Sequence, residues 1–446
     1  MPAGPPGSTG PPGSFGARVA SRQAEGTLVV QPRMGFADPA KMRAGLIATK
    51  HARACTVGTI TLDSYTRVGD QASVLAALER GDDLNGYPIV GHGVTTTRSV
   101  MRGVADRDFP IQVRHGSADP RSIVTALLAC GLDATEGGPV SYCLPYSRTP
   151  LARSVERWRE SCELLAAART RDREPHLETF GGCMMGQLCP PALLVAISVL
   201  EGLFFVQHGL RSISLSYAQQ TSAEQDTEAV TALRRLTAEL LPDVQSHIVI
   251  YSYMGVYPCT PAGARRLLAA SARLAVATGA ARLIVKTSAE AFRIPTIEEN
   301  VRALEAAALV ASAPAGKPAG KPAGKAAAAV SGRPAAGDGT GIYAQALALI
   351  SAVLDLADDV GRALLLAFDR GYLDVPYCLH PDNAGRTRGY LDSAGRLQWQ
   401  RIGSMPIRHL AEVPAQTRMT SAGLLDSLSF VQNTFDHAGL ARSIGS

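Results

Sequence analysis

The sequence lacks the short motifs that mark the common nucleotide-binding and hydrolytic sites. It has no Gly-x-Gly-x-x-Gly after the first predicted strand and no Gly-x-x-x-x-Gly-Lys-Ser/Thr anywhere. It also has no Gly-x-Ser-x-Gly nucleophile turn and no His-Glu-x-x-His pair. The motif-bearing forms of dinucleotide binding, P-loop phosphate binding, α/β-hydrolase chemistry and zinc proteolysis are therefore excluded.

Metal-ligand and disulfide patterns are missing as well. The eight cysteines are scattered without a Cys-x-x-Cys pair or a Cys/His ligand spacing, and the nine histidines form no metal constellation. Scattered cysteines of this kind are typical of reduced thiols in the cytoplasm. We therefore expect a cytoplasmic protein without a metal site.

Signals for secretion, membrane insertion and nucleic-acid binding are weak. Residues Met1 to Gly16 are rich in Pro, Gly and Ser and do not have the basic and apolar regions of a signal peptide. The most hydrophobic window, Leu193 to Val206, is interrupted by Glu201 and is shorter than the roughly 18 residues that span a membrane. The net charge is only +5, from 44 Lys and Arg against 39 Asp and Glu. We expect neither a membrane nor a nucleic acid among the partners.

Eight short apolar runs are present, and each ends in polar or charged residues. Ala/Leu/Arg/Glu-rich stretches that are typical of helices separate most of the runs. This alternation predicts an α/β fold, an eight-stranded (β/α)8 TIM barrel, with the active-site groups at the carboxyl ends of the strands. The predicted strands are 28–30, 57–62, 110–113, 132–135, 176–179, 212–215, 247–250 and 283–285.

At 446 residues the chain is longer than one barrel of about 250 residues, so an accessory segment is expected. A helical stretch over Ile342–Arg370 and a β-hairpin over Gly389–Trp399, with its turn at Asp392–Gly395, predict a C-terminal helical and hairpin lobe beside the barrel. The repeated Ala-Gly-Lys-Pro composition before the lobe predicts a mobile linker. The expected organisation is a disordered tail at 1–24, the barrel at 25–310, the linker at 311–341 and the lobe at 342–446.

Three arginines lie where the first three strands end. Arg33, Arg67 and Arg114 would repel one another unless an anion lay between them, so they indicate a small polyanionic substrate. The alternative is that each arginine pairs privately with a neighbouring carboxylate. His115 is the only histidine at a predicted strand end.

Other polar residues at the same end suggest further roles. Glu136 would bind an ammonium group or accept a proton, and Tyr142 and Tyr146 would present hydroxyls to one place unless they are ordinary half-buried tyrosines. Lys286 could form a Schiff base or contact an anion, and Glu290 would lie on the same side of a following helical turn.

Seven segments in register resemble one family. The chain is similar to the large (epsilon) subunit of glutamate mutase, also called methylaspartate mutase, which depends on adenosylcobalamin. The likeness covers residues 27–310 and resumes near Asp374 and Asn383. The segments are Gln31-Pro32-Arg33-x-Gly35, Asp63-Ser64-Tyr65-Thr66-Arg67, Leu84-Asn85-Gly86-Tyr87-Pro88, Arg114-His115-Gly116, Glu136-Gly137-Gly138-x-x-Ser141-Tyr142-x-x-Pro145-Tyr146, Val285-Lys286-Thr287-x-x-Glu290-Ala291 and Ile294-Pro295-Thr296.

The resemblance implies a role for each matched residue. Arg33, Arg67 and Arg114 would bind the two carboxylates of glutamate, with hydrogen bonds from His115 and Tyr142, and Glu136 with Tyr146 would hold the amino group. Lys286 and Glu290 would bind the ribose hydroxyls of the cofactor. The residues expected to contact the adenosyl group and the corrin are Gly35, Asn85, Pro145, Phe180, Tyr257, Lys286, Glu290 and Ile294.

The chain departs from the family in three places. Gln219-Gln220-Thr221-Ser222 stands where the family more often has Cys-Gly-Asn, Tyr251-Ser252-Tyr253 where it has His-Gln-Trp, and Gly182-Cys183-Met184-Met185 where it has Pro-Leu-Thr. These changes concern the corrin and partner side of the predicted site.

The Asp-x-His-x-x-Gly motif of cobalamin-binding modules is absent; Asp436-His437-Ala438-Gly439 has the wrong spacing. The resemblance therefore implies a separate small cobalamin-binding subunit that carries this motif, and a homodimer of the large subunit within a heterotetramer.

The expected function is a radical carbon-skeleton mutase that interconverts L-glutamate and 3-methylaspartate. One alternative is a mutase for a related dicarboxylate, such as a 2-oxo or substituted acid. Another is a barrel that has lost turnover and serves as a binding or assembly subunit. The three clustered arginines argue against this last alternative.

Overall fold

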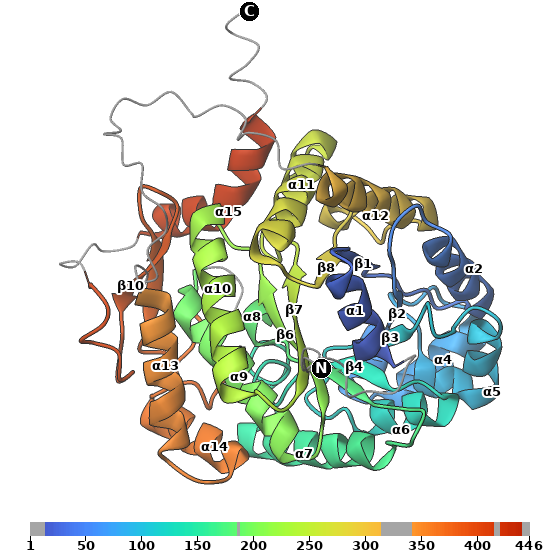
Figure 1. Cartoon of the computed structure of the whole chain (residues 1–446), viewed down its shortest axis with the longest axis horizontal. Helices are drawn as coiled ribbons and strands as arrows, with labels where there is room; N and C mark the ends of the chain where they lie inside the picture. The colour runs from blue at the N-terminus through green and yellow to red at the C-terminus, as the bar shows by residue number, and fades with distance from the viewer. Residues whose placement is uncertain (1–13, 185–187, 314–340, 414–419, 439–446) are drawn as a thin grey trace, which may run out of the picture.

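Eight parallel strands form a barrel enclosed by helices (Figure 1). The computed structural model describes residues 14–184, 188–313, 341–413 and 420–438. The (β/α)8 barrel predicted from the apolar runs is confirmed, and every predicted run overlaps one strand. The strands are β1 (Val29–Pro32), β2 (Gly58–Thr61), β3 (Ile111–Arg114), β4 (Ala134–Glu136), β5 (His176–Glu178), β6 (Ser212–Ala218), β7 (Gln245–Tyr251) and β8 (Arg282–Val285).

The sheet runs in the order β1-β8-β7-β6-β5-β4-β3-β2, and two backbone hydrogen bonds link its ends. Val30 N donates to Cys55 O at 2.9 Å, and Thr61 N donates to Met34 O at 2.9 Å. A Cβ on Gly35 would lie 2.0 Å from Thr61 O, so only glycine permits this approach of the chain after β1 to the end of β2.

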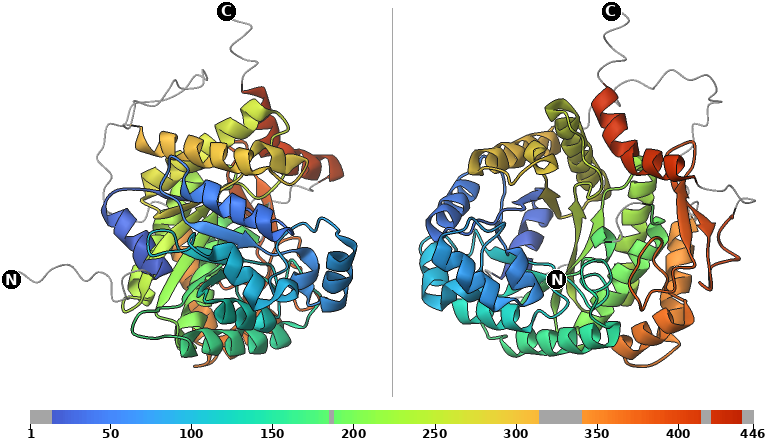
Figure 2. Two further views of the ribbon diagram at one scale, coloured as in Figure 1. Left: turned by 90° about the vertical axis from the view of Figure 1, so that its right-hand side faces the viewer. Right: turned by 180° about the vertical axis from the view of Figure 1, so that it is seen from behind.

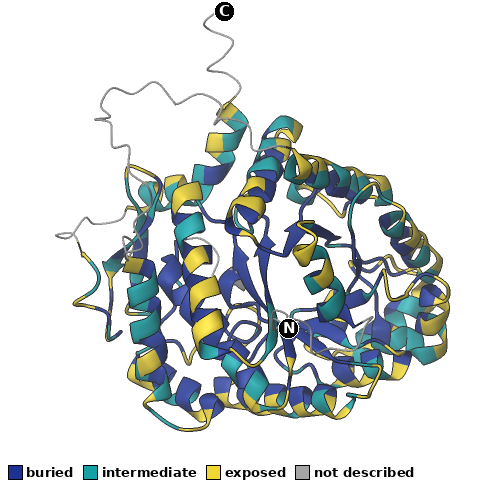
Figure 3. Cartoon of the chain, in the orientation of Figure 1, coloured by how far each residue is buried: buried dark blue, intermediate teal, exposed yellow. Residues whose placement is uncertain are grey.

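Helices follow the strands and cover the outside of the barrel (Figure 3). Several begin at a side chain that accepts a backbone N–H, such as Asp38, Ser222 and Thr296. They are α2 (Pro39–Lys50), α3 (Ser64–Val68), α4 (Gln71–Arg80), α5 (Ile89–Met101), α6 (Arg121–Cys130), α7 (Leu151–Ala167), α8 (Gly181–Met184), α9 (Pro191–Gln207), α10 (Ala223–Leu240), α11 (Pro261–Thr278), α12 (Ile297–Ser312) and the 3-10 helix η1 (Ser288–Ala291).

The expected tail at 1–24 is wrong in its second half, because residues Phe15–Ala24 form helix α1. Phe15 and Val19 are fully buried, and the Phe15 ring lies 5.1 Å from the ring of His176, the first residue of β5. The helix therefore closes the end of the barrel at which the strands begin. The Pro- and Gly-rich composition hid a helix whose apolar residues are few but buried. Residues 1–13 lie outside the described part.

The C-terminal lobe packs beside the barrel, as expected (Figure 2). Helix α13 (Gly341–Leu354) contacts α9 and α10, so α9 is covered on both faces and is almost entirely buried. The predicted helical stretch is two helices, the second being α14 (Val360–Arg370). The predicted hairpin is confirmed as β9 (Arg388–Leu391) and β10 (Leu397–Arg401). Helix α15 (Ser421–His437) packs on α11.

The expected linker at 311–341 lies almost wholly outside the described residues, since 314–340 are not described. Helix α12 continues to Ser312, slightly beyond the boundary we expected, and α13 begins at Gly341. No helix of the described residues is long and apolar enough to cross a membrane.

Candidate functional site

The barrel brings the three predicted arginines to the end where the strands finish. Arg114 is the last residue of β3, Arg33 directly follows β1, and Arg67 lies in α3 directly after β2. Arg33 lies close enough to Arg67 to disfavour the charge on Arg67. The carboxyl ends of barrel strands are the usual location of active sites in this fold.

Arg114 and Glu136 form a buried ion pair at the centre of this end. Arg114 Nε donates to Glu136 Oε2 at 2.7 Å, and both side chains are at most 4% exposed. The hydroxyls of Tyr142 and Tyr251 also donate to Glu136, the latter at 2.7 Å. Burial would lower the pKa of Arg114, but Glu136, Tyr251 and Tyr142 together outweigh it and raise this pKa well above its ordinary value. Glu136 is therefore held rigidly by Arg114, by Tyr142 and by the Tyr251 hydroxyl, whose single proton it shares with Glu178, and it can accept about four hydrogen bonds.

Arg67 differs from the other two arginines because its charge is not neutralised. Its Nε donates to the Leu62 carbonyl at 2.8 Å, and no carboxylate in the described part of the chain forms an ion pair with it. Burial lowers the pKa of Arg67, partly opposed by Tyr142 and Glu136. A half-buried guanidinium without a counter-ion is costly unless an anion joins it.

His115 presents a hydrogen-bond donor beside Arg67. Its Nδ1 accepts from Ser117 N at 3.2 Å, so the ring proton is assigned to Nε2, which has no partner among the described residues. The ring stacks on Trp158 and meets the edge of Tyr142. Burial, Arg67 and Arg114 together lower the pKa of His115 to about 3. The imidazole is therefore neutral at physiological pH.

A second cluster joins β1 to the segment after β8. Arg33 Nη1 lies 2.8 Å from Glu290 Oε2, and Glu290 Oε1 accepts from Thr287 N at 3.0 Å, which closes a capping box around η1. The Lys286 ammonium lies 4.3 Å from the centre of the Tyr257 ring. Burial lowers the pKa of Lys286 to about 8, although Glu290 opposes the effect.

Two of the three arginines thus pair privately with a carboxylate, as the alternative interpretation proposed, and one does not.

The Tyr257 hydroxyl is buried and has no hydrogen-bond partner in the described residues. Lys286 likewise has no hydrogen bond there. These are polar groups that a bound ligand could satisfy.

The remaining predicted residues of the substrate and cofactor sites have different surroundings. Phe180 is 3% exposed and packs against Tyr142 at 4.9 Å, and Tyr146 is half exposed with its ring 5.7 Å from Tyr142. Asn85 Oδ1 accepts from Ser64 N at the start of α3. Ile294 is 48% exposed, and none of the contacts described here joins Asn85 or Ile294 to the arginines.

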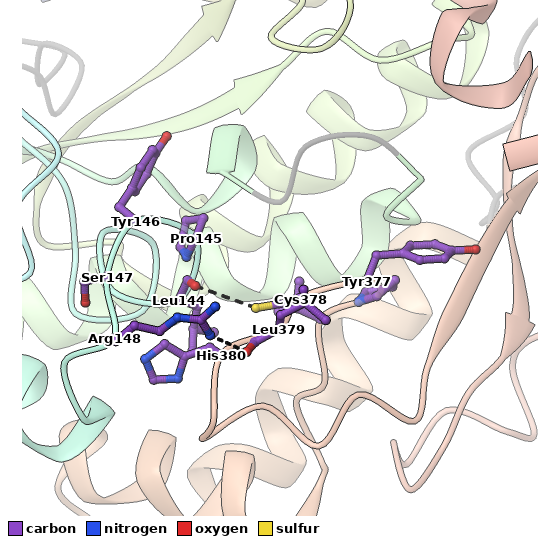
Figure 4. A pocket seen from close by; sticks show the side chains of 11 residues that line it. Leu144, Pro145, Tyr146, Ser147, Arg148, Tyr377, Cys378, Leu379 and His380 are labelled. Atoms are coloured by element: carbon purple, nitrogen blue, oxygen red, sulfur yellow. Dashed lines mark hydrogen bonds between the residues drawn. The ribbon is translucent and has the colours of Figure 1, made fainter. Parts of the chain in front are cut away.

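A cavity of about 560 Å³ lies between the loop after β4 and the C-terminal lobe (Figure 4). Pro145 and Tyr146 line one side, and residues 375–380 line the other. Arg148 Nη1 donates to Leu379 O at 2.6 Å and ties the two sides together. Pro145 and Tyr146 therefore connect the polar site to this cavity.

A fully buried polar layer lies inside the barrel and was not predicted from the sequence. Tyr251 bridges Glu136 to Glu178, and Glu178 pairs with Arg282. Gln31 and Gln112 also bind Arg282, and all these side chains are unexposed. The available signal was polar residues within predicted buried strands, because such residues must pair with one another. Tyr251 links this layer to the site.

The arrangement can bind a small molecule that has both a negatively charged group and a positively charged group. Arg67 and the Nε2–H of His115 offer uncompensated donors, whereas Glu136 offers a negative charge among them. Within the described ranges, no three His, Cys, Asp or Glu side chains are placed to hold a metal ion.

A family model described as the methylaspartate mutase E chain (MutE) matches residues 11–427. The chain belongs to this family. Members carry the name glutamate mutase epsilon subunit, and glutamate mutase is an isomerase, an intramolecular transferase. The chain is therefore a mutase subunit of that family, and the resemblance seen in the sequence is confirmed.

Individual relatives are similar in sequence to this chain over most of its length. The glutamate mutase epsilon subunit of Halobacterium salinarum is 32% identical over 355 residues, which cover 78% of this chain and 71% of the relative. The epsilon subunit of Escherichia coli O157:H7 is 29% identical, and the match covers 86% of this chain and 79% of the relative. That of Desulfitobacterium hafniense is also 29% identical, and the match covers 88% of this chain and 81% of the relative. A putative fructose-1,6-biphosphate aldolase structure from Coccidioides immitis matches with a TM-score of 0.36 and 16% identity over 65% of this chain and 92% of its own, too low to bear on function.

Proposed function

We propose that the chain is the substrate-binding subunit of an adenosylcobalamin-dependent mutase that interconverts L-glutamate and 3-methylaspartate. The observation that carries the proposal is the charge pattern of the site. Arg67 has no counter-ion among the described residues, and a rigidly held Glu136 stands opposite it among the arginines. A dicarboxylate with one ammonium group complements both features.

Different residues of the site would bind different groups of the substrate. Arg67 and the Nε2–H of His115 would bind one carboxylate directly. Arg33 and Arg114 are held by Glu290 and Glu136, so a second carboxylate would share them with these partners. Glu136 retains about one free acceptor position for the ammonium group, next to Tyr142. Tyr146, expected to assist Glu136, is half exposed at the edge of the site.

The cluster around Lys286 fits the adenosyl group. The unpartnered Tyr257 hydroxyl and the Lys286 ammonium are buried polar groups that ribose hydroxyls would satisfy, together with Glu290. Ile294 offers exposed apolar surface, whereas Phe180 is buried against Tyr142. When bound, the cofactor supplies homolytic cleavage of its cobalt–carbon bond and hydrogen-atom abstraction. The protein orients the substrate and keeps water away from it.

A partner is needed for the corrin. The absence of Asp-x-His-x-x-Gly from the sequence, together with the epsilon-subunit names of the relatives, supports a separate small subunit that brings the corrin to the end of the barrel where the arginines lie. We propose a cytoplasmic assembly of both subunits, with the large subunit as a homodimer within a heterotetramer.

Reconstitution tests this proposal. The purified chain alone should bind adenosylcobalamin poorly and be inactive. Mixed with its cognate small subunit, adenosylcobalamin and L-glutamate, it should form 3-methylaspartate and show the electron paramagnetic resonance signal of a coupled cobalt–organic radical pair. The signal without this product would redirect the proposal to another dicarboxylate. Neither signal nor product from a panel of dicarboxylates, in a verified complex, would leave the chain as a binding or assembly subunit.

A variant tests the role of the ammonium group. Glu136→Gln keeps the shape of the side chain and removes its charge, so it should impair glutamate far more than a 2-oxo acid of equal length. An equal loss for both acids would show that Glu136 acts only through the structure, or that the substrate has no ammonium group.

A further inference from the structure

Glu201 is a buried carboxylate that none of the binding roles above uses. It lies on α9, a helix that is otherwise apolar apart from Ser198 and the terminal Gln207, and its side chain is unexposed. Glu201 Oε1 accepts from Val140 N at 3.0 Å and from Ser141 N at 2.8 Å. These two amides lie in the short loop that joins Glu136 to Tyr142.

The loop is shaped around this carboxylate. A Cβ on Gly138 would lie 2.2 Å from the Glu201 carboxyl group, so a larger residue would displace either the loop or Glu201. Gly137 has φ of 130°, and a Cβ there would meet Trp158 and Tyr142. The two glycines therefore allow the backbone to pass directly over Glu201.

A second loop meets the same carboxylate. The backbone amide of Phe180, which follows β5, is close enough to favour the charged form of Glu201. Phe180 packs against Tyr142 at 4.9 Å, and Tyr142 donates to Glu136. Glu201 thus lies beneath two loops whose side chains meet at the substrate site.

We propose that Glu201 is a positioning residue whose charge holds the 137–142 loop, and through it places Tyr142 against Glu136. This role rests on the proposed function, because Tyr142 and Glu136 are its substrate-binding groups. A charged acceptor binds backbone amides more strongly than a neutral one. The loop is therefore held firmly when Glu201 is ionised and loosely when it is protonated.

The surroundings of Glu201 shift the change between its ionised and protonated forms to near neutral pH. Burial raises its pKa to about 7, although the amides of Ser141, Val140 and Phe180 oppose the rise. In the described part of the chain, no lysine, arginine or histidine forms an ion pair with it. The titratable group that faces it from α7 is the Cys162 thiol, and burial raises the pKa of this thiol well above its ordinary value, so it stays neutral.

The charge also affects stability. Because the folded-state pKa of Glu201 lies above the ordinary value of 4.5, its contribution to stability is fully present below pH 4.5 and is lost as the pH rises through about 7. Glu201→Gln removes the ionisation and keeps an oxygen acceptor. The variant should therefore unfold at a higher temperature than the wild type at pH 8, and the difference should be smaller at pH 5.5.

The full chain and its complex with the small subunit test the proposal. At pH 8, Glu201→Gln should increase amide hydrogen exchange in residues 137–146 and raise the KM for L-glutamate about tenfold, with a smaller change in kcat. At pH 5.5, after correction for the slower intrinsic exchange rate, the wild type should itself show the reduced protection of this loop, because its Glu201 is neutral. A pH-dependent difference of this kind would not follow from a residue that merely fills space.

Asp226→Asn is the matched control. Asp226 is also buried, with a pKa raised to about 7 by burial, but it binds Tyr217 and Gln220 N rather than the 137–142 loop. At pH 8, Asp226→Asn should raise the unfolding temperature as Glu201→Gln does, but it should leave amide hydrogen exchange in residues 137–146 unchanged. Equal exchange of that loop in Glu201→Gln and the wild type at pH 8 would overturn the proposal. This readout holds even if the wild-type complex proves inactive, so failure of the mutase proposal is recognised separately.

Discussion

Arg33 and Glu290 form an ion pair, Nη1 to Oε2 at 2.8 Å, although they lie 257 residues apart in the chain. The pair joins the end of β1 to η1 after β8. It also lies between the two proposed ligands, since Arg33 would bind a substrate carboxylate and Glu290 a ribose hydroxyl. A ligand that engages either residue must share it with the other, so the two proposed binding sites would be physically connected.

Lys286, next to this pair, should lower the stability of the protein at neutral pH. Its folded-state pKa of about 8 lies below the ordinary value of 10.5 because the side chain is buried. The cost of holding the charged form is therefore fully present below pH 8 and is relieved as the pH rises toward 10.5. The difference of roughly 2.5 pKa units corresponds to about 3 kcal/mol.

Lys286→Met tests this consequence. The variant should have a free energy of unfolding higher than the wild type by up to about 3 kcal/mol at pH 7, and the gain should shrink at pH 10. Urea unfolding of both proteins at the two pH values measures it. The same variant should bind adenosylcobalamin more weakly in the assembled complex. A gain in stability that does not change with pH would show that packing, and not the buried charge, is responsible.

Arg67 and Arg114 should respond differently to the same substitution. Arg114→Met leaves Glu136 buried without its cation and should destabilise the fold by about 3–5 kcal/mol. Arg67→Met removes a half-buried charge that has no counter-ion in the described residues, so stability should stay the same or rise. Its loss should appear instead in kcat/KM for glutamate, by about 3 kcal/mol or roughly 100-fold.

Unfolding curves and kinetics of the two variants, measured side by side, separate binding from folding. Normal kcat/KM in Arg67→Met would remove the argument that this arginine binds a carboxylate. Equal destabilisation by both substitutions would show that Arg67 has a structural partner.

The barrel and the strand-end residues were predictable because their signals are local. Each strand is a short apolar run, and Arg33, Arg114 and Glu136 lie at or next to the ends of such runs. Pairing could not be predicted, because it depends on which strands become neighbours in space. Arg33 could have paired with any nearby carboxylate, and only the closure of β1 against β8 brings Glu290 to it.

Helix α1 escaped prediction for a related reason. Its sequence has only two fully buried apolar side chains, Phe15 and Val19, and follows a Pro- and Gly-rich start. What makes the helix stable is the open end of the barrel, where Phe15 meets His176 and Arg282. A sequence pattern cannot show a surface that strands far apart in the chain create together.

Phe15→Ala should therefore destabilise the protein by about 3–5 kcal/mol, as expected for an aromatic side chain lost from a core. Chemical denaturation measures the change. Leu309→Ala is a suitable control, because Leu309 is 72% exposed and its loss should change the free energy of unfolding by less than about 0.5 kcal/mol. A small effect at Phe15 would mean that α1 lies loosely on the barrel and that the end is closed by other groups.

His115 should act as a neutral hydrogen-bond donor at every pH at which the protein is folded and active. Burial and two neighbouring arginines lower its pKa to about 3, and Ser117 N occupies Nδ1, so the proton stays on Nε2. Nitrogen NMR of the labelled protein should show the Nε2–H tautomer unchanged from pH 5 to pH 8.

His115→Gln keeps an N–H donor and should lose less affinity for glutamate than His115→Phe, which should lose about tenfold. Titration of His115 near its ordinary pKa would show that its ring reaches solvent and would end its assignment as a fixed donor.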